Sequence, residues 1–158
     1  MANTQSMCTS FMGELMTATH NFGTAPIRAA TTADTFKAAL YLTTATVNAS
    51  TTAYSATNEV SGTNYTAGGV TVTNATPPTA TNSSATAGVA YWTPSASITY
   101  SNVTLSTAFD CVLIYNSTQS NKAVSVHTFG SQTVTAGTFT LTMPSNTTST
   151  ALLRLATT

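Results

Sequence analysis

Residues that could perform hydrolytic chemistry are few and scattered along this chain. Nucleophilic catalysis needs a base beside the nucleophile, and the only histidines are His20 and His127. Cys111 and His127 form a conceivable dyad, but Cys111 lies in a fully apolar run, where a thiol is typically inert. No serine lies in a Gly-x-Ser-x-Gly elbow. His20 falls near the end of a predicted helix, where the helix dipole favours histidine. The sequence therefore predicts no nucleophilic active site.

Carboxylates and metal ligands are equally sparse. Glycoside hydrolysis requires two carboxyl groups at a defined separation. Glu14 lies in the predicted helix and Asp34 opens a predicted strand. Nothing in the sequence brings the remaining two, Glu59 and Asp110, together. The histidines and cysteines lack the paired spacing of zinc sites. We therefore expect no enzymatic activity, no metal site and no cofactor.

The two cysteines, Cys8 and Cys111, do not amount to a disulfide framework. Free cysteine is among the most buried residue types, and the cytoplasm keeps thiols reduced. We therefore expect two free, buried thiols with no bond between them.

Charge is almost absent from this chain of 158 residues, which has the length of one domain. Charged residues make up 5%, with four basic against four acidic side chains, where about a quarter is usual. The basic residues are scattered and cannot track a phosphate backbone, so we expect no nucleic-acid binding. With no signal-peptide pattern and no apolar run of transmembrane length, we expect a cytoplasmic origin and no membrane contact. A neutral surface keeps molecules apart poorly and suits an assembling subunit.

The opening segment has helical periodicity. Apolar residues recur in pairs four apart from Met7-Cys8 to Leu15-Met16, which predicts a helix near residues 6–21. With the connector that follows, it would form an arm over residues 1–34. The apolar stripe is a candidate partner-docking face and consists of Met7, Phe11, Met12, Leu15, Met16 and Phe22. This stripe either packs on the protein's own sheet or docks onto a partner. Methionine suits docking because it adapts to irregular surfaces.

After residue 35 the apolar period changes to two, which predicts strands. Abundant threonine, β-branched and stiff, favours the same structure. The expected strands are 36–42, 70–73, 97–105, 111–115, 123–129, 138–143 and 151–156, with Gly130 ending the fifth and residues 74–88 forming a long loop. The apolar phase shifts between Tyr100 and Val103, which indicates a β-bulge or a sharp bend.

These strands predict an all-β fold. We expect a β-sandwich or jelly roll of about seven to eight antiparallel strands over residues 35–158, with one N-terminal α-helix. The expected core comprises Leu40, Leu42, Val112, Ile114, Val126, Phe139, Leu141 and Leu153.

Several segments of the chain resemble small tailed-bacteriophage virion structural proteins. They are the opening up to the helix and residues 59–70, 111–116, 122–130, 139–144 and 152–156. The likeness lies in sequence texture and segment order, and no catalytic motif or functional residue carries over. It implies a capsid decoration or cement protein.

The expected function is that of a non-enzymatic virion protein on the capsid surface, made in the host cytoplasm, which stabilises the assembled head shell. Its partners would be the major capsid protein and itself, as a homotrimer or homodimer. The alternative is a tail or head-fibre module that binds a host receptor or glycan. Its sugar-stacking candidates are Tyr41, Tyr54, Tyr65, Tyr91 and Trp92.

Overall fold

The computed structural model describes residues 3–16, 19–20, 22, 33–73, 78–81 and 88–156. This part of the chain is mostly β, with 50% of the described residues in strands and eight strands in two antiparallel sheets. This confirms the all-β prediction.

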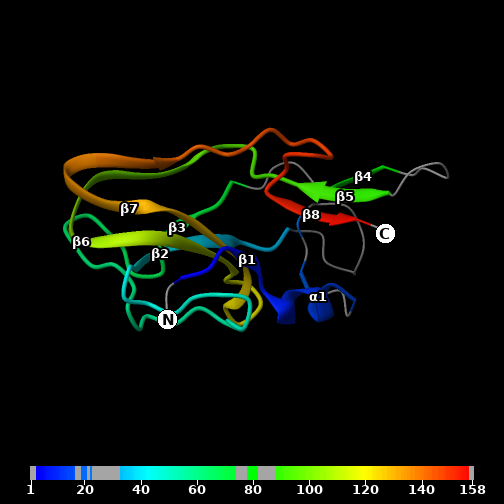
Figure 1. Ribbon diagram of the computed structural model, residues 1–158, viewed down its shortest axis with the longest axis horizontal. Helices are drawn as coiled ribbons and strands as arrows, with labels where there is room; N and C mark the ends of the chain where they lie inside the picture. The colour runs from blue at the N-terminus through cyan, green and yellow to red at the C-terminus, as the bar shows by residue number, and fades with distance from the viewer. Residues whose placement is uncertain are drawn as a thin grey trace.

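A five-stranded and a three-stranded sheet make up the fold (Figure 1). The larger has the order β1 (Ser6–Met7), β7 (Lys122–Leu141), β6 (Ile98–Asn116), β2 (Phe36–Leu42) and β3 (Val70–Thr71). The smaller has the order β4 (Thr79–Thr81), β5 (Val89–Trp92) and β8 (Leu153–Ala156). The helix α1 spans Thr9–Met16.

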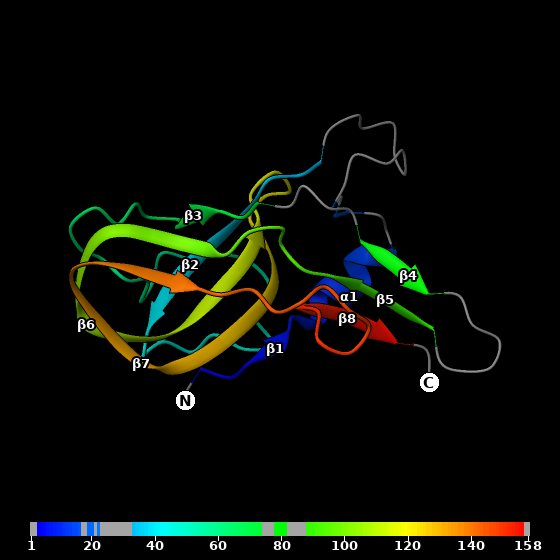
Figure 2. The same cartoon turned by 90° about the horizontal axis from the view of Figure 1, so that it is seen from above.

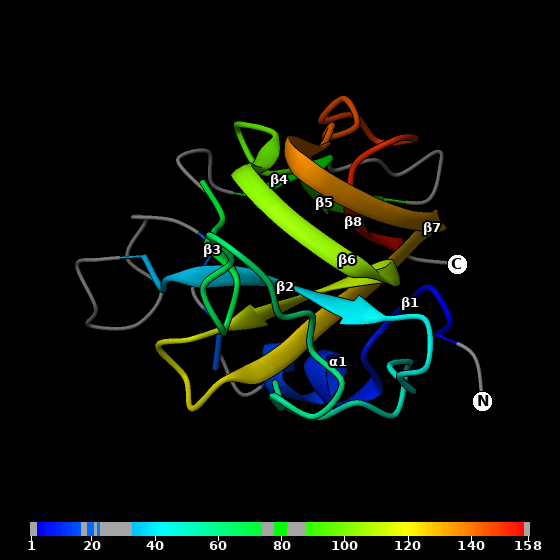
Figure 3. The same cartoon turned by 90° about the vertical axis from the view of Figure 1, so that its left-hand side faces the viewer.

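One long hairpin, β6–β7, dominates the larger sheet. Its register shifts at several points, the first between Tyr100 and Val103, which confirms the bulge or bend predicted there. Bulges increase the local twist, so the hairpin folds back over the rest of the sheet. The Tyr100 hydroxyl crosses the gap and donates a 2.8 Å hydrogen bond to the Ala38 carbonyl of β2. Figure 3 shows the folded-back half on one side of β2 and α1 on the other.

The core lies between these layers. Five of the predicted core residues are buried: Leu40, Val112, Ile114, Val126 and Leu153. The other three, Leu42, Phe139 and Leu141, are partly buried against the same cluster. The core also includes Cys8, Phe11 and Phe22, so it extends beyond residues 35–158. The division into an arm of residues 1–34 and a β-domain stays a prediction.

Several boundaries differ from expectation. The predicted strands 97–105 and 111–115 are one strand, β6, and Gly130 does not end a strand because β7 continues to Leu141. Residues 6 and 7 pair with β7 as β1 instead of opening the helix. The strand β5 was not predicted, and β4 lies inside the expected loop 74–88.

Both cysteines are free and buried, as predicted. Burial raises the pKa of Cys8 to about 11, with Glu14 adding to the effect. Burial likewise raises the pKa of Cys111 to about 12, reinforced by Asp110. Both groups are therefore protonated, inert thiols at neutral pH.

Candidate docking site

An apolar groove lies between α1 and the smaller sheet. Its volume is about 220 Å³. Four residues of the predicted docking face line it, namely Met7, Phe11, Leu15 and Phe22. The rest of the lining is Pro78, Ala90, Tyr91, Trp92, Leu153 and Leu155. The sequence did not indicate the contribution of the smaller sheet, because β5 was not predicted.

The docking-face residues differ in how far they are available to a partner. Phe11 is only 2% exposed, and Phe22 stacks on Phe36 with ring centroids 4.4 Å apart. Met7 and Leu15 are half-buried against the core. The side chains of Met12 and Met16 lie outside the described part of the structure. The face therefore contributes its aromatic residues to the protein's own core, and its use by a partner stays a prediction.

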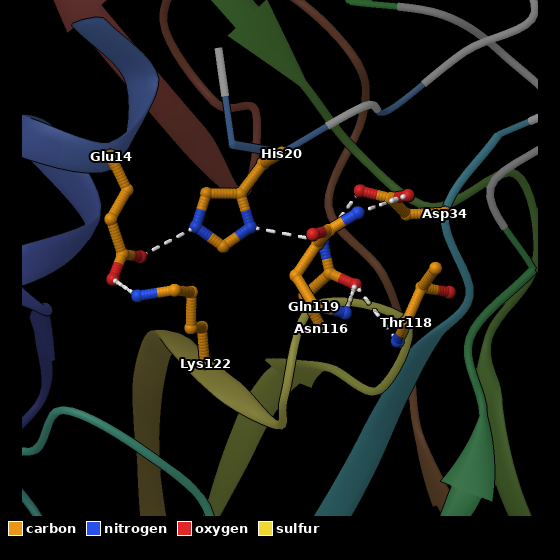
Figure 4. A network of polar contacts seen from close by, with 7 residues as sticks. All are labelled: Glu14, His20, Asp34, Asn116, Thr118, Gln119 and Lys122. Carbon is orange, nitrogen blue, oxygen red and sulfur yellow. Dashed lines mark hydrogen bonds and ion pairs between the residues drawn. The ribbon is translucent and has the colours of Figure 1, made fainter. Parts of the chain in front are cut away.

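A polar cluster behind the groove ties α1 to the rest of the protein (Figure 4). The buried His20 ring lies between the Glu14 carboxylate and the Asn116 amide. Its Nε2 lies 2.7 Å from Glu14 Oε2, and its Nδ1 lies 3.0 Å from Asn116 Nδ2. Because the amide nitrogen Nδ2 can only donate, Nδ1 accepts and Nε2 carries the proton. Burial lowers the pKa of His20 despite the opposing effect of Glu14, which is consistent with this neutral tautomer.

Asn116 is the centre of the cluster and is 0% exposed. Its Nδ2 also donates to Asp34 Oδ2 at 2.8 Å. Its Oδ1 accepts from the backbone N–H groups of Thr118 at 3.1 Å and Gln119 at 3.2 Å, and so holds the hairpin turn. Every donor and acceptor group of the amide is therefore used, as a buried polar side chain requires.

Lys122 completes the connection. Its Nζ donates to Glu14 Oε1 at 2.6 Å. Burial raises the pKa of Glu14, but the hydrogen bonds from Lys122 and His20 outweigh that effect and leave it lowered. The helix is thus anchored to the β6–β7 turn by an ionised carboxylate. This cluster was not predicted from the sequence. The sequence signal for it is a single asparagine, Asn116, directly after the apolar run 111–115.

The conceivable dyad of Cys111 and His127 is wrong. His127 lies opposite Val112 in the sheet, whereas Cys111 lies opposite Thr128. Adjacent positions point to opposite faces, so the thiol and the imidazole are separated by the sheet. The partner of His127 is instead Ser125, whose Oγ lies 2.9 Å from its Nε2. Burial lowers the pKa of His127 to about 4, which makes it a weak base.

The predicted sugar-stacking aromatics do not form one exposed platform. Tyr41 and Trp92 are buried. The hydroxyls of Tyr54 and Tyr65 donate to the two oxygens of Glu59, at 2.6 and 2.8 Å. Tyr91 lies apart from these tyrosines and lines the apolar groove.

Within the described residues, no group of three or more potential ligands is placed to hold a metal ion. No helix in the same part of the chain is long and apolar enough to cross a membrane. Comparison of the chain with family models, curated proteins and solved structures finds no significant match.

Proposed function

We propose that this protein is a non-enzymatic phage virion protein that decorates the head and cements the assembled shell. It would bind the major capsid protein and act as a homo-oligomer on the capsid surface. The architecture proposed with it is a β-sandwich or jelly roll with an N-terminal helix, supported by the two antiparallel sheets and by α1.

The observation that carries the proposal is the internal use of the acidic side chains. All four carboxylates accept hydrogen bonds from within the chain. Glu14 binds His20 and Lys122, Asp34 binds Asn116 and Gln119, Glu59 binds Tyr54 and Tyr65, and Asp110 binds Asn3. The few acidic side chains thus serve the fold. A surface without strong charge offers little repulsion to closely packed subunits, as a layer on a shell requires.

The groove supports the same proposal. It is lined by apolar side chains and bordered by Leu155, which is 41% exposed. Apolar surface of this kind is a place where a capsid subunit can be contacted. The burial of Tyr41 and Trp92 favours cementing over the glycan-binding alternative, because a sugar-stacking ring must be exposed.

Binding to assembled shells tests this proposal. We expect the purified protein to co-sediment with expanded, empty heads and to show no binding to unassembled capsid subunits. The reason is that a cement protein contacts junctions that exist only in the shell. Copurification with tails, or binding of the isolated protein to host cells, would instead support the adhesion module.

A further inference from the structure

The outer edge of β8 is open. This strand ends the smaller sheet and pairs only with β5 among the described strands. Figure 2 shows β4, β5 and β8 side by side, with β8 outermost. Arg154, Leu155 and Ala156 are all exposed. The strand carries neither the lysine nor the proline that commonly protect an edge from pairing.

The backbone groups of Arg154 and Ala156 point to this open side. The N–H of Val89 donates to Thr81 Oγ1 at 3.1 Å and its C=O accepts from the same hydroxyl at 3.4 Å, so the backbone of Val89 faces β4. Backbone groups alternate in direction along a strand, so the next residue, Ala90, faces β8 and forms a hydrogen-bonded pair with Leu155 opposite it. The N–H and C=O of Arg154 and Ala156 therefore face away from β5. The open edge thus presents backbone donors and acceptors on both sides of Leu155, whose apolar side chain is exposed.

We propose that β8 pairs antiparallel with β8 of a second copy, about a two-fold axis through Leu155. The smaller sheets of the two copies then join in the order β4-β5-β8-β8-β5-β4. A two-fold axis perpendicular to the sheet keeps equivalent faces on the same side. The two Leu155 side chains therefore cover one another, and the two apolar grooves lie next to each other.

The charges of β8 fit a second copy in this register. With Leu155 opposite itself, Arg154 lies opposite Ala156 of the other copy. The two guanidinium groups are never directly opposed, which avoids the repulsion of like charges across a strand pair. Each Arg154 also donates from Nε to the Thr148 carbonyl of its own chain at 2.6 Å. The pairing of β8 with β8 rests on the proposed function, which includes a homo-oligomer. It selects the dimer over the trimer.

A charge-swap experiment tests the pairing, because residue 155 meets its own copy. Leu155→Lys and Leu155→Glu are made in the full chain, and their mass in solution is measured by sedimentation equilibrium. We expect a dimer for the unmodified protein and at least about tenfold weaker association for each variant alone. An equimolar mixture of the two variants should restore the dimer. Ala80→Lys, on the opposite edge strand β4, is the matched control and should remain dimeric.

Circular dichroism and thermal unfolding establish that each variant is folded, which the exposure of Leu155 favours. A monomeric unmodified protein, another stoichiometry, variants that dimerise unchanged or a mixture that stays monomeric would each overturn the pairing. Loss of shell binding in Leu155→Lys, with a monomeric unmodified protein, would assign the edge to a capsid subunit instead. Because association is measured without shells, a dimer that fails to bind heads would contradict only the proposed function.

Discussion

At the scale of single residues, the polar groups of this protein are arranged to serve the fold. Asn116 bridges His20, Asp34 and the hairpin turn while fully buried. A buried amide with every group paired stabilises one geometry and strongly disfavours others. His127 is half-buried, and its Nε2 lies 2.9 Å from the hydroxyl of the buried Ser125.

Burial of His127 predicts that the free energy of unfolding decreases as the pH falls. Its pKa is about 4 in the folded protein, against an ordinary value of 6.5. Between these values the unfolded chain binds more protons, so acidification favours unfolding. From pH 7 to pH 5, His127 alone should cost about 2 kcal/mol. His20, whose pKa is also lowered, acts in the same direction.

Urea unfolding at these two pH values measures the effect. His127→Gln keeps a polar side chain beside Ser125 but removes the titration, so its stability should depend less on pH. Glu14 does not confuse the result, because its lowered pKa places its titration below this window. An equal loss of stability in the variant and the unmodified protein would show that His127 is not the responsible group.

Some residue-level features could be predicted from the sequence and others could not. The free thiol of Cys111 was predictable because it opens the apolar run 111–115. The cluster around Asn116 was not, since Glu14 and Lys122 are brought together by folding across a separation of 108 positions. Sequence spacing carries no information about such a contact.

At the scale of elements, the structure depends on the bend in β6–β7. The phase shift between Tyr100 and Val103 revealed the bend, because a bulge moves apolar residues to the other face. The continuity of the strands was not evident, since Gly130 is typical of a strand end. Pairing continues on both sides of it, with Cys111 opposite Thr128 and Phe109 opposite Gln132, so the glycine lies within the strand at another register shift.

The helix α1 has a structural side and an accessible side, and two substitutions should separate them. Phe11 packs against His20 and Phe22, with ring centroids 4.8 and 5.9 Å apart. Phe11→Ala should therefore lower the free energy of unfolding by about 3–5 kcal/mol. Leu15→Ala, at a half-buried position of the groove, should cost about 1 kcal/mol and weaken binding to shells.

Urea unfolding and co-sedimentation with heads measure the two effects on the same samples. Thr140→Ala, an exposed position in the strand β7, serves as a control that should change neither. Normal shell binding by Leu15→Ala would show that this part of the helix is not a docking surface.

At the scale of the whole molecule, the scarcity of charge is the feature that sequence and structure share. The sequence shows how few charged residues there are, and the structure shows that every carboxylate is bound within the chain. A free monomer with such a surface is prone to associate. The proposed attachment to a shell and the proposed pairing with a second copy would both use this tendency.

Heating heads with and without the protein tests the cementing role most directly. A ligand that binds only the assembled shell stabilises it by mass action. DNA-filled heads saturated with the protein should therefore release their DNA at a higher temperature than bare heads at the same ionic strength. Release is followed by the fluorescence of a DNA-binding dye. Equal release temperatures for decorated and bare heads, with binding verified in the same sample, would contradict the account.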